Sequence, residues 1–253
     1  MDVTWQMLII VCPLAFLAGF VDSVAGGGGL ISLPAYYLAG LPPVLAAGTN
    51  KLSAALGTLT ASARFISGGW VQLRVAVLAA LGAFPGSWLG TTLLQHIPED
   101  AVRIMMIAAI PLVALVVLRK GDGMQGVCRV KGRAFDLVSL LIGLVVGFYD
   151  GLVGPGTGTF LILLFTMILG MEAVTASGTA KLVNLASNVA SLTTLLFAGQ
   201  VLAGLGIPAA GCAILGNYLG AGMTMRKGTG FIRGMLMVVL ALLLAKMVLD
   251  VLS

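Results

Sequence analysis

GFVDSVAGGGGLISLP, residues 19–34, is the stretch that decides the fold, and a second copy of it, GFYDGLVGPGTGTFLI, occupies residues 147–162. Each copy places one carboxylate, Asp22 or Asp150, and a cluster of glycines inside an otherwise apolar run. Packing alone does not require a carboxylate there, because a charged side chain is almost never buried without a partner. We therefore predict that the two copies mark equivalent points in two halves of the chain.

The composition indicates an integral membrane protein. Of the 253 residues, 59% are hydrophobic and 9% are charged, with a mean hydropathy of +1.11, whereas about a quarter of a soluble domain is charged. A bilayer-spanning helix needs about 20 apolar residues, and such runs nearly fill the chain. The sequence predicts an all-α polytopic membrane protein whose function lies within the bilayer.

Several functional classes are disfavoured by the residues that the chain lacks. The three cysteines are widely spaced and His96 is the only histidine, so we expect no metal site, no cofactor and no disulfide framework. No nucleophile and base pair suggests an intramembrane enzyme, and no GxxxxGK[ST] motif suggests ATP hydrolysis. The net charge of +5 comes mostly from short loops, which indicates membrane topology rather than nucleic-acid binding.

The apolar runs divide the chain into two repeats, residues 1–120 and 134–253, joined by a basic linker at 121–133. Each repeat begins with a stretch too long for one span, and glycines break it into two helical pieces. These stretches are residues 5–41, broken at 26–29, and residues 135–170. Ordinary spans are expected at 44–66, 71–94 and 101–118, and then at 173–197, 201–223 and 231–251.

Further matches between the halves support an internal duplication. GTNKL at 48–52 matches GTAKL at 178–182, and GSWLG at 86–90 matches GNYLG at 216–220. Coincidence explains this poorly because charged residues and glycines align together. The GxxxG pairs also predict close helix approach.

The loop charges favour opposite orientations for the two halves. In the first half, Arg64 and Arg74 flank the loop after the second span, whereas in the second half Arg226 and Lys227 precede the last span. Cytoplasmic loops carry excess lysine and arginine, so the basic linker is expected in the cytoplasm and the halves form an inverted repeat. Each broken first segment would then be a re-entrant hairpin. Eight plain spans with parallel halves remain the alternative.

The glycine breaks are candidate anion sites. A helix that starts at a break has free backbone N–H groups and about half a positive charge at its N-terminus, and inverted symmetry would bring two such ends together near the midplane. The alternative is that the glycines only let helices pack closely. The substrate-binding candidates at the breaks are Gly27, Gly28, Gly29, Gly154, Gly156, Thr157 and Gly158.

Two lysines, Lys51 and Lys181, lie one to two turns inside their spans, where ionisable residues are costly and usually functional. They are candidates for substrate binding, or for structural salt bridges with Asp22 and Asp150. The two carboxylates are candidates for those salt bridges or for proton coupling, because burial raises a carboxylate pKa.

Two amides on the same helices, Asn50 and Asn184, are further candidates. Asn50 stands beside Lys51, and Asn184 and Asn188 lie one and two turns beyond Lys181 on one helix face. They would line a polar path to the site, or join neighbouring helices by hydrogen bonds.

With these residues in view, the chain resembles the TauE/SafE family of sulfite exporters, also called the 4-toluene sulfonate uptake permease family. The motifs that carry the resemblance are GFVD at 19–22, the glycine run at 26–29 with Pro34, and GTNK at 48–51, each with an echo in the second half. The resemblance covers nearly the whole chain and implies a multi-pass permease of the bacterial inner membrane for small anions such as sulfite, sulfonates or sulfoacetate. The second copy departs from the first at Pro155, Thr157 and Ala180, so the two half-sites are not expected to be equivalent.

These observations favour a secondary transporter of small anions, bound near the midplane between the broken helices and the two lysines. The alternative is a protein that conducts protons or cations and is organised by Asp22 and Asp150. The expected partners are a small anionic substrate and the lipid bilayer, with proton coupling and a homo-oligomer left open.

Overall fold

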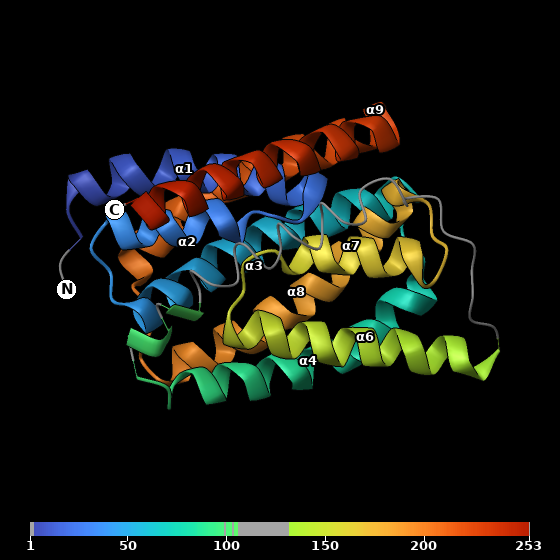
Figure 1. Ribbon diagram of the computed structural model, residues 1–253, viewed down its shortest axis with the longest axis horizontal. Helices are drawn as coiled ribbons and strands as arrows, with labels where there is room; N and C mark the ends of the chain where they lie inside the picture. Colours follow the sequence, from blue (N-terminus) through green and yellow to red (C-terminus); the bar gives the residue numbers. More distant parts are fainter. Residues whose placement is uncertain (1–2, 99, 103, 106–131, 253) are drawn as a thin grey trace.

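The computed structural model describes residues 3–98, 100–102, 104–105 and 132–252. All regular structure within these ranges is helical, as the sequence predicts (Figure 1). The predicted span at 101–118 and the basic linker lie almost wholly outside the described residues. The helices are α1 (Trp5–Ala25), α2 (Gly29–Leu38), α3 (Pro43–Ser67), α4 (Leu73–Leu94), α6 (Arg133–Leu152), α7 (Thr157–Met167), α8 (Ala173–Phe197) and α9 (Ala203–Leu252).

Five of these helices are long and apolar enough to cross a membrane: α1, α4, α6, α8 and the part of α9 at 203–232. α3 and α8 each have 25 residues. α3 is less apolar, because Asn50, Lys51 and several hydroxyl side chains lie along it. The two helices with the most polar residues along their length are therefore α3 and α8, which carry the predicted lysines.

Both predicted helix breaks are present. α1 ends where Gly26 adopts φ +76°, a left-handed conformation that glycine adopts at little cost, and α2 starts three residues later. α2 has 10 residues, about 15 Å at 1.5 Å per residue, which is about half of a 30 Å hydrocarbon core. α1 packs against α2, and α6 packs against α7, so each pair forms a helical hairpin. α6 begins at Arg133, inside the predicted linker.

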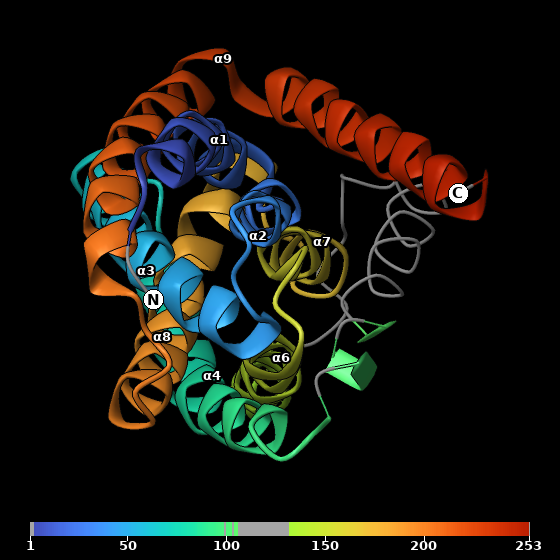
Figure 2. The ribbon, with the colours of Figure 1, turned by 90° about the vertical axis from the view of Figure 1, so that its left-hand side faces the viewer.

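α9 contains a second kind of break. Its continuous hydrogen-bonded path is interrupted at Gly228, where φ is +70° and ψ is −158°. Figure 2 shows the helix bending there into two arms. The arms correspond to the two spans predicted at 201–223 and 231–251. Since only glycine reaches this backbone conformation without strain, Gly228 sets the direction of the last arm.

The helices of the two halves interlock. α1 lies along α9 and α6 lies along α4, so the first helix of each half packs on the fourth helix of the other, while α3 and α8 pack together between them. Added β-carbons at Gly86 and Gly90 would overlap backbone carbonyl oxygens of α6, and Gly216 and Gly220 face α1 in the same way. The GxxxG motifs therefore lie at the contacts where backbones approach most closely, as predicted.

Candidate functional site

The two glycine breaks meet in the middle of the molecule. A β-carbon on Gly158 would lie 2.5 Å from Cα of Gly26, and one on Gly26 would overlap the backbone of Gly158 and Thr159. The hydroxyl of Thr159 also donates to the carbonyl oxygen of Ala25, at 2.7 Å. Glycine is required at both positions because the two backbones touch directly.

Two ion pairs flank this contact, and each joins the two halves. Lys51 Nζ lies 2.7 Å from Asp150 Oδ2, and Lys181 Nζ lies 2.7 Å from Asp22 Oδ2. The Lys181 side chain is fully buried and the Asp22 side chain is 15% exposed, whereas both members of the other pair are below a tenth exposed. A buried charge is tolerated only when it is paired and hydrogen-bonded. The lysines and carboxylates therefore hold the two halves together at their centre.

The Lys51 pair has additional hydrogen bonds. Lys51 Nζ also donates to Asn188 Oδ1, at 3.0 Å. The Asp150 carboxylate also accepts from two hydroxyls, those of Thr157 at 2.8 Å and Ser187 at 2.6 Å. Asp150 is thus held by three donors on three different helices.

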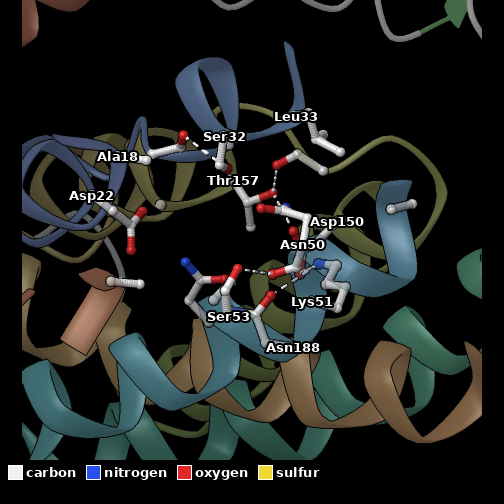
Figure 3. Close-up of a pocket in the computed structure, with 18 of the residues that line it drawn as sticks. Ala18, Asp22, Ser32, Leu33, Asn50, Lys51, Ser53, Asp150, Thr157 and Asn188 are labelled. Atoms are coloured by element: carbon white, nitrogen blue, oxygen red, sulfur yellow. Dashed lines mark hydrogen bonds and ion pairs between the residues drawn. The ribbon is translucent and has the colours of Figure 1, made fainter. Parts of the chain in front are cut away.

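A cavity of about 60 Å³ adjoins the breaks. Since about 10–15 Å³ by this kind of measure holds one water molecule, the cavity has room for several waters or one small ion. Figure 3 shows Lys51, Asp150 and Asn188 close together, with Asp22 standing apart from them. The polar residues that line the cavity are Asp22, Ser32, Asn50, Lys51, Ser53, Asp150, Thr157, Asn184, Asn188 and Asn217.

Most of the residues predicted for the site line this cavity. They include four glycines of the breaks, Gly28, Gly29, Gly154 and Gly158. Gly27, Gly156 and Lys181 are not among the lining residues, and Lys181 reaches the cavity only through its partner Asp22. The two lysines therefore do not stand in equivalent positions relative to the cavity.

Three polar lining residues, Ser32, Ser53 and Asn217, were not predicted. Asn217 lies in the GNYLG motif of an apolar span, and an amide in that setting is a signal that could have been used. Its side chain accepts from Ser23 Oγ at 2.8 Å and donates to the carbonyl oxygen of Ala213. Ser32 and Ser53 had no such signal, because serine is common in membrane helices.

Backbone conformation at the breaks differs between the halves. Gly154 and Gly156 have φ of +94° and +81°, as expected of positions that need glycine. Gly28 differs from both, because its φ is −56°. Its need for glycine is steric, because a β-carbon there would lie 2.5 Å from Cβ of Asp22 and 2.7 Å from the carbonyl oxygen of Ala18.

The helices that start at the breaks present free donors. Neither α2 nor α7 has a side-chain cap, and within the described residues no carbonyl accepts from the backbone N–H groups of Gly28, Gly29, Gly158 or Thr159. Among the buried side-chain atoms of the described segments, Asn50 Oδ1 has no hydrogen-bond partner. The cavity wall therefore has unused hydrogen-bonding groups of both kinds.

The described part of the chain contains no group of three or more His, Cys, Asp or Glu side chains that could hold a metal ion. Its titratable groups near the cavity are two carboxylates and two lysines, and they are already paired. The arrangement is suited to binding and releasing a small polar solute, because the ionic side chains hold one another in pairs beside a cavity.

Comparison with known proteins agrees with this geometry. The family model described as sulfite exporter TauE/SafE matches residues 11–247. A probable membrane transporter protein of Haemophilus influenzae is 40% identical over 253 residues, which cover 99% of this chain and 98% of that protein. The probable membrane transporter protein YfcA of Escherichia coli K12 is 35% identical over 98% of this chain and 94% of its own length.

No solved structure matches the chain significantly. The family model and both relatives nevertheless extend over nearly its whole length, including both breaks and both ion pairs. The chain therefore belongs to the sulfite exporter TauE/SafE family and is a multi-pass membrane transporter rather than an enzyme.

Proposed function

We propose that this protein is a secondary transporter of small anions in the bacterial inner membrane, with sulfite, sulfonates and related organosulfur or carboxylate compounds as the substrate class. The observation that carries the proposal is the cavity at the meeting of the two helix breaks, where two uncapped helix N-termini lie side by side. Each N-terminus contributes about half a positive charge and free N–H donors. An anion would bind where these two fields add.

The lysines support anion binding in a secondary way. Lys51 lines the cavity and uses two of its three ammonium protons on Asp150 and Asn188, which leaves one proton for a ligand. Lys181 is fully buried against Asp22, so its charge would act on a bound anion over a longer distance. Two lysines and two carboxylates cancel in formal charge, and the backbone donors would therefore decide the preference for anions.

An inverted repeat is part of the proposal. The exchanged ion pairs and the exchanged packing of α1 on α9 and α6 on α4 are what a two-fold relation between the halves would produce. α1 begins and α9 ends at the same end of the molecule (Figure 1). Transporters with this symmetry place the substrate between their broken helices and alternate access around it.

A thermal-shift screen of the purified protein against sulfite, small sulfonates and small carboxylates tests the proposal. Binding of an anion to the folded state stabilises it and raises the melting temperature. At a ligand concentration about 100 times the dissociation constant, the free energy of unfolding rises by about 2.7 kcal/mol. Sodium chloride at the same ionic strength is the control. If no anion in the screen raises the melting temperature above this control, the proposed substrate class is wrong.

Proton or cation conduction is the second candidate, and it is favoured by the one carboxylate, Asp22, that is partly exposed to the cavity. The two functions differ in the sign of the charge that crosses the membrane. Reversal potentials across a planar bilayer or a liposome with an anion gradient distinguish them. A potential that follows the substrate anion supports the transporter, and one that follows pH or the cation gradient supports conduction.

A further inference from the structure

Asp22 and Asp150 occupy the same position in the two copies, but their surroundings differ. Asp150 accepts hydrogen bonds from three side chains: Lys51 at 2.7 Å, Thr157 at 2.8 Å and Ser187 at 2.6 Å. The Asp22 carboxylate accepts from one described side chain, that of Lys181, through Oδ2. Its other oxygen, Oδ1, has no partner among the described residues.

The difference follows from two substitutions between the copies. Thr157 is the first residue of α7, and the first residue of α2 is Gly29. Each stands at the same spacing after its aspartate, so Gly29 is the counterpart of Thr157 but has no hydroxyl. The counterpart of Ser187 is Gly57, which also has none. Asp22 therefore lacks both hydroxyl donors that saturate the other carboxylate.

The free oxygen belongs to a residue that lines the cavity, and its side chain is 15% exposed. Asn50 supplies a second acceptor in the cavity wall, since its buried Oδ1 has no partner in the described part of the chain and its counterpart in the second half is Ala180. Both unused acceptors thus belong to the first half. An anion that enters this cavity meets donors at the helix N-termini and acceptors on Asp22 and Asn50.

We propose that the cavity selects anions that also carry a hydrogen-bond donor, an O–H or N–H group that binds Oδ1 of Asp22; this inference rests on the proposed function. An anion without a donor would displace water from a carboxylate oxygen and leave that oxygen unpaired beside a like charge, and both effects are unfavourable. An anion with a donor replaces the water and offsets the repulsion. Asp22 is then a specificity-determining residue, whereas Asp150 is a structural one.

A matched pair of ligands tests the selectivity. Ethanesulfonate and 2-hydroxyethanesulfonate carry the same acid group on the same two-carbon chain and differ by one terminal hydroxyl. We expect the purified protein to bind the hydroxylated compound about fivefold more tightly or better, because an acceptor that a ligand cuts off from water and leaves unpaired costs at least that factor. Isothermal titration calorimetry measures both dissociation constants on one preparation.

A matched pair of variants tests the role of Asp22. Gly29→Ser restores the hydroxyl that Thr157 provides in the other half, and Gly29→Ala adds the same β-carbon without a hydroxyl. The nearest atom to that β-carbon would be Cα of Pro155 at 3.4 Å, an ordinary contact, so both variants fit. We expect the serine variant to lose most of the selectivity, because its hydroxyl stands at the sequence position from which Thr157 donates to Asp150, and the alanine variant to keep it.

The outcomes separate this inference from the function on which it rests. Equal affinity of the wild type for the two sulfonates overturns the inference, and so does the same affinity ratio in the serine and alanine variants. A failure of the wild type to bind either sulfonate, sulfite or any small carboxylate overturns the proposed function, and the inference with it. A preference that disappears only in the serine variant supports both.

Discussion

At the scale of single residues, the two lysines have different neighbours despite identical motifs. Lys51 shares a network with Asp150 and Asn188, whereas within the described residues the Lys181 ammonium donates to Asp22 alone. Removal of either lysine leaves a carboxylate without its cation in a largely buried position, which costs about 3–5 kcal/mol when no water replaces the partner. Cavity exposure of Asp22 reduces this cost for the Lys181 pair.

We expect Lys51→Ala and Lys181→Ala each to abolish or sharply reduce anion uptake into proteoliposomes while the protein still inserts. Lys51→Ala should lower the melting temperature more, because Asp150 is the more deeply buried carboxylate. Arginine at either position should rescue uptake only in part, since a planar guanidinium cannot reproduce the geometry of a compact ammonium.

The double variant Lys51→Met with Asp150→Leu is the control that separates structure from transport. It removes the pair without leaving an uncompensated charge, so stability should recover toward the wild type. Uptake should not recover if Lys51 takes part in transport. Wild-type uptake in this double variant, or in both alanine variants, would instead make the pair purely structural.

The four ionic residues beside the cavity could be predicted from the sequence, but their pairing could not. Two copies of an intramembrane aspartate and of a GT-x-K motif were enough to select Asp22, Asp150, Lys51 and Lys181 as a group. Which lysine meets which carboxylate could not be read from the motifs, because the partners are 99 and 159 residues apart and come from opposite halves. Their pairing depends on how whole helices pack.

At the scale of the helices, the glycines divide into two physical classes. Gly154 and Gly156 have positive φ, Gly158 is limited by direct backbone contact, and Gly26 is limited by both. Apolar runs and glycine breaks located the helices well from sequence alone, and α8 spans the predicted residues 173–197. The sequence could not distinguish a glycine needed for a positive φ from one needed for close backbone packing, since the residue is the same in both cases.

We expect Gly158→Ala to lower the melting temperature strongly, by several degrees or more, because its β-carbon would lie 2.5 Å from Cα of Gly26. Backbone on both sides prevents relaxation, and overpacking of this kind costs about 1–3 kcal/mol or more. Gly28→Ala should show a similar loss, since its β-carbon would overlap Asp22. Thermal unfolding of the purified variants in one detergent provides the comparison.

Gly211→Ala is the matched control, because a β-carbon on that glycine of α9 would have no neighbour within 4 Å. Its melting temperature should stay the same or rise slightly, as alanine is favoured over glycine in a helix by about 0.5–1 kcal/mol. If Gly158→Ala melts like Gly211→Ala, the breaks do not touch in the protein. Affinity lost without stability would assign Gly28 to the substrate site instead.

At the scale of the whole molecule, the basic residues and the cavity lie toward opposite ends. The end of the molecule where α3 finishes and α4 begins carries Arg64 and Arg74, and Arg64 lies against Gly222 of α9, five residues before Lys227. The cavity extends toward the other end, where Leu94 and Leu195 line it. An apolar cluster that includes Phe65 and Val174 lies on the basic side of the breaks. With the basic end in the cytoplasm, the cavity would face the periplasm.

The predicted topology is tested by cysteine labelling in a variant that lacks Cys12, Cys128 and Cys212. Thr4 and Ser67 are exposed. The start of α1, which Thr4 caps, and the end of α3, whose last residue is Ser67, lie at opposite ends of the molecule (Figure 1), and a single cysteine at each reports one side of the membrane. Since α1 begins at the end remote from the basic residues, an impermeant maleimide added to intact cells should label Thr4→Cys and leave Ser67→Cys unlabelled until the membrane is permeabilised.

Gly123→Cys and Ser253→Cys, both outside the described residues, extend the test: we expect the first in the cytoplasm and the second in the periplasm. A cytoplasmic residue 253 together with a cytoplasmic residue 123 would rule out the inverted repeat and leave eight spans with parallel halves, because four full spans return the chain to the side on which it started, whereas a hairpin and three spans place the linker on the opposite side from both termini.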